Sequence, residues 1–388
     1  MTAVYLDHAA TTPLRPEARA AWLAAQDIVG NASSIHGGGQ AARRVLEESR
    51  ERLAVVLGCD AVEVVFTSGG TEAVNLAVKG LWWSRPDGAD TVVLPDGEHH
   101  ATLDAVGWLV AHEGAIVKPV RLDGVGRIDA SGFADALPGA ALATALIANN
   151  EVGTVQDAAA MARAAGDAGV PLHLDAVSAF GHLPVSFRQW RADAVGAAGL
   201  VALSVSGHKV GAPVGVGALV VSRQSTPTPL QHGGGQQRGL RAGTQDVAGA
   251  AAFAVAAELA EHEREAEARR LDDLRDALAR SIRSSLPDAE VLGDPVERIP
   301  GNLHVLFPGA SGETLLFLLD QAGISVSTGS ACQAGVPEPS HVVLALGRTE
   351  REARSVLRFT FGRTSTGADL TRVVAALPEA YARAAAAR

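Results

Sequence analysis

The sequence predicts an α/β fold with a mostly parallel β-sheet. Short apolar runs recur along the chain and alternate with helical or loop segments; the runs span residues 62–66, 91–94, 143–148, 172–174, 201–205 and 217–221. Alternation of this kind is typical of a parallel sheet that is covered by helices on both faces. Three of the runs end in polar clusters, at residues 149–151, at Asp175 and at residues 206–209. Because ligands of open α/β sheets bind beyond the carboxyl ends of the strands, we expect the functional site at these clusters.

Size and composition indicate a compact protein of two domains, with three as the alternative. The chain has 388 residues, of which 47% are hydrophobic and 20% are charged, so it is long enough to bury a large core. Its formal net charge of -10 disfavours direct binding of nucleic acid and attachment to an acidic membrane surface. We therefore expect neither a nucleic-acid nor a membrane partner.

The amino terminus and the cysteine content favour a cytoplasmic protein. Residues 1–8 lack the basic and apolar regions of a signal peptide, and no apolar segment is long enough to span a bilayer. Cys59 and Cys332 are the two cysteines, which is too few for a disulfide framework, and a reducing compartment leaves both thiols free. Cys59 follows a helix-ending glycine, so we interpret it as a packing or surface residue.

The first part of the chain predicts two helices and a glycine turn. Helical spacing extends over residues 15–29 and 40–57, and Gly58 is placed to cap the second helix. The run at residues 62–66 is followed by Ser68-Gly69-Gly70-Thr71 and then by a helical pattern through Lys79. A glycine turn between a strand and a helix presents unpaired N–H groups to an anion. The segment is therefore either a phosphate cradle or only a tight turn.

One long helix is predicted from residue 246 to about residue 286. It is apolar at first and strongly charged over residues 261–275, a run that we interpret as a solvated helix face. Short strands resume at residues 302–306 and 356–361. The helix is therefore expected to lead from one domain into another.

The turn Ser206-Gly207-His208-Lys209 carries the candidate reactive amine. A strand that delivers a lysine into the crevice at its carboxyl end is one way in which an α/β sheet presents an amine to a cofactor. Most lysines are solvated surface charges, and this alternative stands for Lys209 taken alone.

Short motifs in a fixed order cover nearly the whole chain. They are Tyr5-Leu6-Asp7-His8-Ala9-Ala10-Thr11-Thr12-Pro13, Gly69-Gly70-Thr71-Glu72, Glu98-His99-His100, Asn149-Asn150-Glu151-Val152-Gly153, His173-Leu174-Asp175-Ala176, Ser206-Gly207-His208-Lys209, His232-Gly233-Gly234-Gly235, Arg241-Ala242-Gly243-Thr244, Ser327-Thr328-Gly329-Ser330-Ala331-Cys332 and Leu357-Arg358-Phe359. Together they resemble the NifS/IscS-like cysteine desulfurases of the class V aminotransferase family, which are fold-type I enzymes that use pyridoxal phosphate. The order of the motifs makes this resemblance more specific than any single motif.

The resemblance implies a fold and a domain division. It implies a large domain with a mostly parallel seven-stranded sheet between helices, over residues 14–256. A smaller α+β domain would comprise residues 1–13 and 257–388 and would carry the loop with the catalytic cysteine.

The resemblance also implies the cofactor, pyridoxal 5'-phosphate, and its ligands. Lys209 would form the Schiff base and move the Cα proton, and Asp175 would keep the ring nitrogen protonated. His99 would lie over the ring and act in proton transfer. The remaining cofactor-binding residues, most of them around the phosphate, would be Gly70, Thr71, Asn150, Ser178, Ser206, His208 and Thr244. Thr244 resembles the residue that reaches across a dimer to the partner's phosphate, so a homodimer is expected. For Asp175, a turn cap is the alternative interpretation.

The substrate-binding and catalytic groups are implied in the same way. Arg358 would bind the substrate carboxylate with help from Asn31 and Asn150, because its planar fork suits a bidentate contact. An internal salt bridge is the alternative for Arg358. Cys332 lies in a small-residue loop with two prolines, unlike the apolar setting of an inert cysteine, and would receive the sulfur.

Two features depart from the family pattern. The family usually carries a glutamine where this chain has Ser178, so the contact to the cofactor's phenolic oxygen is lost, bridged by water or taken over by Asn150. Residues 187–201 form a longer stretch than in typical relatives, with a role in access or partner binding left open.

The resemblance implies a cysteine desulfurase that takes sulfur from L-cysteine, releases L-alanine and forms a Cys332 persulfide. A sulfur-acceptor protein would follow, in iron–sulfur cluster assembly, tRNA thiolation or DNA phosphorothioation. Two alternatives remain: a selenocysteine lyase or other C–S lyase that uses pyridoxal phosphate, and a catalytically weak sulfur-relay or partner-binding protein.

Overall fold

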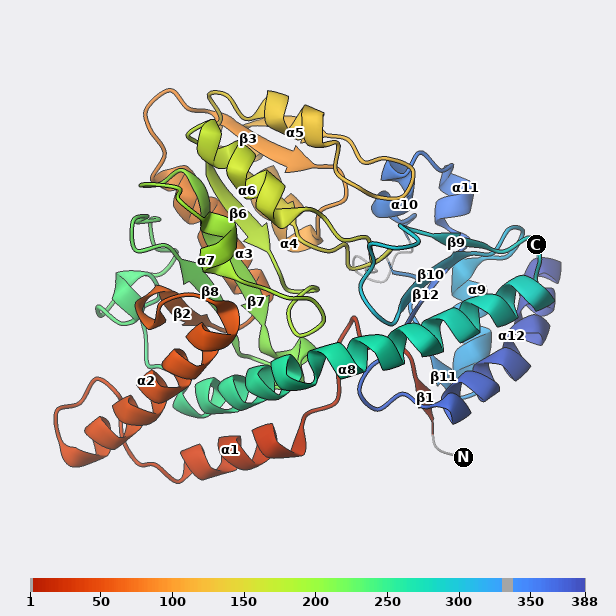
Figure 1. Cartoon of the computed structure of the whole chain (residues 1–388), viewed down its shortest axis with the longest axis horizontal. Coiled ribbons are helices and arrows are strands. Elements are labelled where there is room, and N and C mark those ends of the chain that lie inside the picture. Colours follow the sequence, from red (N-terminus) through yellow and green to blue (C-terminus); the bar gives the residue numbers. More distant parts are fainter. Residues whose placement is uncertain (1–2, 330–337, 388) are drawn as a thin grey trace.

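The computed structural model describes residues 3–329 and 338–387, and a seven-stranded sheet forms the centre of its larger part (Figure 1). The strand order is β2-β8-β7-β6-β5-β3-β4. The strands are β2 (Val64–Thr67), β3 (Thr91–Pro95), β4 (Ile116–Val120), β5 (Leu142–Leu146), β6 (Pro171–Asp175), β7 (Gly199–Ser206) and β8 (Gly217–Val221). Strands β7, β6, β5, β3 and β4 are parallel, whereas β8 runs antiparallel to both of its neighbours. The predicted fold class is confirmed.

Strand β4 is the one strand of this sheet that the sequence analysis did not predict. It lies at the sheet edge, where Ile116 is exposed, and it contains Lys118 and Pro119. Proline is tolerated on an edge strand because one side of that strand makes no ladder bonds. Because β4 is an edge strand, it lacks the continuous apolar run from which the other strands were predicted.

Helices cover both faces of the sheet. Those of the described residues are α1 (Pro16–Gln26), α2 (Gly37–Leu57), α3 (Gly70–Trp83), α4 (His100–Glu113), α5 (Ala130–Ala136), α6 (Ala158–Asp167), α7 (Phe187–Arg191), α8 (Val247–Ser285), α9 (Gly312–Gln321), α10 (His341–Ala345), α11 (Glu350–Ala353) and α12 (Gly367–Ala386). Ala202 of β7 packs in a core with α3 and α4, whereas its neighbour Leu203 packs in the core with α2, α6 and α8. This alternation follows from the two-residue period of a strand. It confirms the prediction of a sheet covered on both faces.

Helix α8 contributes to two separate cores. Its first half is alanine-rich and packs with the central sheet, whereas Leu271 and Leu278 pack in a second core with Val4 and Phe359. Figure 1 shows α8 running from the larger part into the smaller part. The predicted division into residues 14–256 and residues 1–13 with 257–388 stays a prediction.

The second core lies around a small antiparallel sheet. Its strand order is β12-β10-β9, with β9 at Glu290–Leu292, β10 at Asn302–Leu306 and β12 at Val356–Thr360. The amino-terminal strand β1 (Val4–Tyr5) pairs in parallel with β11 (Ile324–Ser325). The amino-terminal strand is therefore paired with the segment that leads to residue 329.

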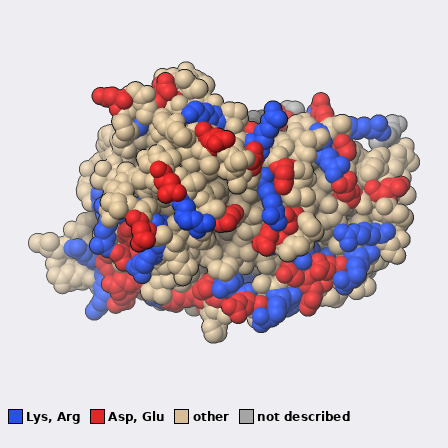
Figure 2. Space-filling view, turned by 45° about the horizontal axis from the view of Figure 1, so that its top comes forward, with Lys and Arg blue, Asp and Glu red and all other residues tan. Residues whose placement is uncertain are grey.

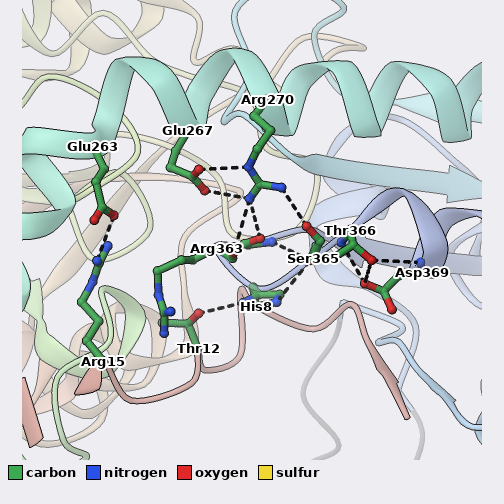
Figure 3. Close-up of polar contacts among 11 residues, drawn as sticks. His8, Thr12, Arg15, Glu263, Glu267, Arg270, Arg363, Ser365, Thr366 and Asp369 are labelled. Atoms are coloured by element: carbon green, nitrogen blue, oxygen red, sulfur yellow. Dashed lines mark hydrogen bonds and ion pairs between the residues drawn. The ribbon is translucent and has the colours of Figure 1, made fainter. Parts of the chain in front are cut away.

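Polar contacts from α8 hold the amino-terminal arm and the turn after β12 together (Figure 3). Arg270 donates to the carbonyl oxygens of Gly362 (3.1 Å), Arg363 (3.4 Å) and Ser365 (2.7 Å). The His8 ring bonds to Thr12 Oγ1 at 2.7 Å and to the Ser365 hydroxyl at 3.4 Å. Because residues 8–12 lead directly to the Lys209 turn, where the Thr12 N–H donates to the His208 carbonyl oxygen, α8 fixes one wall of the site.

The helix end that was predicted at Gly58 agrees with the structure. Gly58 caps α2 in the left-handed conformation (φ 60°), and Cys59 behind it is buried in the core. Figure 2 shows basic and acidic side chains mixed over the visible face rather than separated by sign. Among the described helices, none is long and apolar enough to cross a membrane.

Candidate active site

A cavity of about 310 Å³ lies beyond the carboxyl ends of β5, β6 and β7, beside the amino termini of α3 and α4. The sequence-predicted residues that line it are Gly70, Thr71, His99, Asn150, Asp175, Ser178, Ser206, His208, Lys209 and Arg358. These residues come from six separate stretches of the chain. Five of them converge because the strands that precede them end at one edge of the central sheet, whereas Arg358 lies on β12 of the small sheet.

Lys209 is one of only three lysines in the chain, and it is the one that lines the cavity. It follows β7 in a short 3-10 turn, Gly207–Lys209. A Cβ at Gly207 would lie 3.0 Å from Ala212, Val216 and its carbonyl oxygen, so the tight turn requires glycine. Burial lowers the pKa of Lys209 to about 8, and the Arg358 guanidinium acts in the same direction. The amine is therefore partly neutral near pH 7 and can act as a nucleophile.

His99 lies at the start of α4 and faces the cavity. Its Nδ1 caps the helix by accepting the Ala101 N–H at 3.1 Å. Burial, with the Lys209 ammonium acting in the same direction, lowers the pKa of His99 to about 4. The ring is therefore neutral near pH 7 and carries its proton on Nε2, since Nδ1 is the acceptor.

Asp175 lies at the end of β6 and is 3% exposed. Its Oδ1 accepts the Val177 N–H at 2.8 Å and the Ser204 hydroxyl at 3.2 Å. The turn-cap contact that was the alternative interpretation is thus present. Since Asp175 also lines the cavity and its Oδ2 has no partner among residues 3–329 and 338–387, capping leaves one oxygen available.

The amino terminus of α3 has the properties of an anion cradle. Gly69, in front of the helix, has φ of 153°, a region that glycine adopts and other residues avoid. A Cβ on Gly70 would lie 2.7 Å from Val177. Beside it, Ser206 Oγ is buried and has no hydrogen-bond partner in the described part of the chain. His208, whose Nδ1 bonds to Thr11 Oγ1 at 3.2 Å, lies on the same cavity wall.

Arg358 is held by the amino-terminal arm and by the segment after β5. Its guanidinium forms a salt bridge with Asp7 Oδ1 (2.9 Å) and donates to the Asn150 carbonyl oxygen (2.7 Å). The internal salt bridge that was the alternative interpretation is therefore present. Arg358 Nε and Asn150 Oδ1 are nevertheless buried without a partner in the described residues. Both groups keep hydrogen-bonding capacity at the cavity.

Two predicted residues, Asn31 and Thr244, are not brought to the cavity of their own chain, and Cys332 is not among the described residues. Asn31 is exposed, with Oδ1 accepting the Ser33 N–H at 2.9 Å, and Thr244 is exposed as well. Neither lines the cavity of its own chain. Cys332 lies outside the described residues, but Ser327 and Gly329, shortly before it, line the cavity.

Several residues at the site were not assigned a role from the sequence. Asp7 and Glu98 lie in motifs that were noted, yet nothing in their spacing indicated a salt bridge with Arg358 or a buried carboxyl. Glu98 accepts the Leu146 N–H at 2.8 Å, and burial raises the pKa of Glu98 to about 8. Within the described residues, no cluster of His, Cys, Asp and Glu is suited to hold a metal ion.

Fold and site together define an α/β enzyme with a nucleophilic lysine. The family model for aminotransferase class-V matches residues 4–373. An IscS-like cysteine desulfurase of Mycobacterium tuberculosis is 47% identical, over 98% of this chain and 96% of the relative. The structure of a NifS-like protein superposes with a TM-score of 0.90 at 30% identity, over 98% of this chain and 100% of that one. The structure of SspA in complex with cysteine has a TM-score of 0.77 at 29% identity, over 92% of this chain and 98% of that one. The chain belongs to the class-V aminotransferase family, in its NifS/IscS-like cysteine desulfurase branch.

Proposed function

We propose that this protein is a cysteine desulfurase that works with pyridoxal phosphate bound at Lys209. The observation that carries the proposal is one cavity that holds a lysine with pKa about 8, a buried carboxylate and the amino terminus of a helix. The relationship to the IscS-like cysteine desulfurase supports the same conclusion. Overall, L-cysteine and the Cys332 thiol would give L-alanine and a Cys332 persulfide.

The residues present fit pyridoxal phosphate. The unpartnered Ser206 hydroxyl and the backbone N–H groups at the start of α3 suit a phosphate. The free oxygen of Asp175 suits a protonated ring nitrogen, and the Lys209 amine suits the aldehyde. When bound, the cofactor would supply an electron sink for the carbanion formed at the substrate Cα. Ser178, His208 and Asn150 complete the proposed contacts of this chain.

Substrate binding would use groups whose hydrogen-bonding capacity is unfilled in the described part of the chain, and proton transfer would use Lys209 and His99. Arg358 Nε and the Asn150 side chain would bind the substrate carboxylate. Lys209 would remove the Cα proton, and neutral His99 would take part in a second proton transfer. Salt-bridged Asp7 fixes the guanidinium, which limits the orientations that the substrate can take.

Cys332 would take the sulfur. Its thiolate would attack the substrate sulfur to form an S–S bond while the Cβ–S bond breaks, and the electron pair would stay with the substrate carbon, which is then protonated. Cys332 is the third residue after Gly329, which lies on the cavity wall, and three residues of chain span at most about 11 Å. A reducing compartment keeps the Cys332 thiol free to accept sulfur, so a cytoplasmic location is part of this proposal.

A homodimer would complete the site. Thr244 and Asn31 are exposed and lie away from the cavity of their own chain. Val29 and Ile35, on either side of Asn31, are 90% and 91% exposed, which indicates an apolar surface that a partner covers. Thr244 of one chain would then reach the phosphate in the other chain, and Asn31 would approach its substrate.

The test begins with apoprotein that is loaded with pyridoxal phosphate, reduced with borohydride and mapped by peptide mass spectrometry. The proposal predicts a visible absorption band before reduction and label on Lys209, while Lys79 and Lys118 serve as internal controls. Loaded protein should then convert L-cysteine into alanine. Label confined to the control lysines, or turnover of selenocysteine with none of cysteine, would contradict the proposal.

A further inference from the structure

A row of buried polar side chains crosses three neighbouring strands behind the cavity. Thr144 on β5, His173 on β6 and Ser204 on β7 each have no exposed surface. Thr144 Oγ1 lies 2.9 Å from His173 Nδ1, and His173 Nε2 lies 3.1 Å from Ser204 Oγ. Ser204 Oγ in turn lies 3.2 Å from Asp175 Oδ1. The row therefore ends on the carboxylate at the cavity.

The surroundings of this row are apolar. Leu142 and Ala202, two residues along the same strands from Thr144 and Ser204, face the same side of the sheet and pack against α3 and α4. Polar groups in such a place are costly unless every one is hydrogen-bonded. An apolar row would pack here as well, so the retained polar atoms point to a role beyond packing.

Chemistry fixes the direction of these hydrogen bonds. A carboxylate only accepts, so the single Ser204 hydroxyl proton must be donated to Asp175. Ser204 must then accept from His173, which places the ring proton on Nε2. Burial lowers the pKa of His173 to about 4, so the ring is neutral near pH 7 and its Nδ1 accepts from the Thr144 hydroxyl. Every donor in the row thus points toward Asp175.

A second buried carboxyl lies close enough to compete for the negative charge. Glu98 interacts electrostatically with Asp175 and accepts one bond, from the Leu146 N–H, while its Oε2 is unpartnered among the described residues. Asp175 accepts from both the Val177 N–H and the Ser204 hydroxyl. Asp175 thus accepts more hydrogen bonds than Glu98, and burial raises the pKa of Glu98 to about 8, so Glu98 is mostly protonated near pH 7.

We propose that Thr144, His173 and Ser204 are positioning residues that orient Asp175 and keep it ionised toward the ring nitrogen of the cofactor. This inference rests on the proposed function, since it requires pyridoxal phosphate in the cavity. The three residues touch neither cofactor nor substrate and act through Asp175. Thr144 is the decisive member, because its side-chain bond is to His173 and it has no contact with Asp175.

The test measures the affinity of apoprotein for two ligands by absorbance titration. One ligand is pyridoxal phosphate, and the other is deazapyridoxal phosphate, in which C–H replaces the ring nitrogen. The variant Thr144→Val removes the hydroxyl at nearly constant shape, and Thr144→Ser keeps the hydroxyl. Ser204→Ala and Asp175→Ala shorten the row from the other end, and circular dichroism verifies that each variant is folded.

We expect wild type to prefer pyridoxal phosphate over the deaza analogue. Ser204→Ala removes a hydrogen bond to a charged group and should lose about tenfold of that preference, with little change for the analogue. Thr144→Val removes a bond to neutral His173 and should lose about threefold, again with little change for the analogue. Thr144→Ser should retain the preference, and Asp175→Ala should abolish it.

Each remaining result contradicts one specific statement. If wild type and Asp175→Ala show no preference, the assignment of Asp175 to the ring nitrogen in the proposed function is wrong. If wild type shows the preference and Thr144→Val keeps it, or if Thr144→Val weakens both ligands equally, the positioning role of the row is wrong and its role is structural.

Discussion

At the scale of single residues, Lys209 is set apart from the other two lysines by its surroundings. Its folded-state pKa of about 8 lies below the ordinary lysine value of 10.5, chiefly through burial. The ammonium form therefore dominates below pH 8 and the free amine above it. In apoprotein pulsed briefly with pyridoxal phosphate and then borohydride, labelling of Lys209 should rise with a midpoint near pH 8.

The variant Arg358→Gln tests one cause of the lowered pKa of Lys209. The Arg358 guanidinium lowers the pKa of Lys209, so Arg358→Gln should move the labelling midpoint to higher pH. Peptide mapping of the same samples follows Lys79 and Lys118 as controls. A Lys209 midpoint that coincides with those of the control lysines would contradict the account of a buried amine.

Ser178 gives a prediction on the cofactor's environment. It lines the cavity where the family usually has a glutamine, and serine is the shorter side chain. Ser178→Gln should restore a hydrogen bond to the phenolic oxygen, shift the visible absorption band and raise turnover. A variant with an unchanged band and unchanged turnover would show that the contact is already made by another group.

At the scale of elements, α8 holds the arm and the turn that form one wall of the site. Arg270→Ala leaves three carbonyl acceptors of residues 362–365 without this donor and should lower the free energy of unfolding by about 1–3 kcal/mol. Arg269 is exposed and adjacent, so Arg269→Ala is the matched control and should stay within about 0.5 kcal/mol of wild type. Denaturant unfolding followed by circular dichroism measures both; equal values for the two variants would contradict this role of α8.

The elements also show what the sequence can reveal. Strand β8 coincides with its predicted range because it is a fully buried apolar run between turns, and β10 does so although Asn302 and His304 interrupt its apolar residues. Strand β4 was missed because its edge position admits Pro119 and Lys118. Asp175 ends a buried strand, and the turn with Lys209 directly follows one, so both residues could be predicted from the sequence. The row of Thr144, His173 and Ser204 was not, because its members are 29 and 31 residues apart and only strand register joins them.

At the scale of the whole molecule, the position of Thr244 predicts sites shared between two chains. Lys209→Ala and Thr244→Ala proteins would each be impaired, but a mixed dimer would contain one site with both native residues. Subunit exchange between the two variants should therefore restore activity to about a quarter of wild type, since half of the dimers are mixed and each has one intact site. Activity that stays at the mean of the two parents after exchange would show that Thr244 does not act across an interface.

The central claim concerns the transfer of sulfur to Cys332, and a single-turnover measurement tests it most directly. Protein loaded with pyridoxal phosphate is mixed with a limiting amount of L-cysteine without reductant, and alanine and the intact protein mass are measured in the same sample. The account predicts alanine and an added sulfur atom on Cys332 in equal amounts, and neither product in Cys332→Ala. Alanine and free sulfide formed equally well by Cys332→Ala would contradict it.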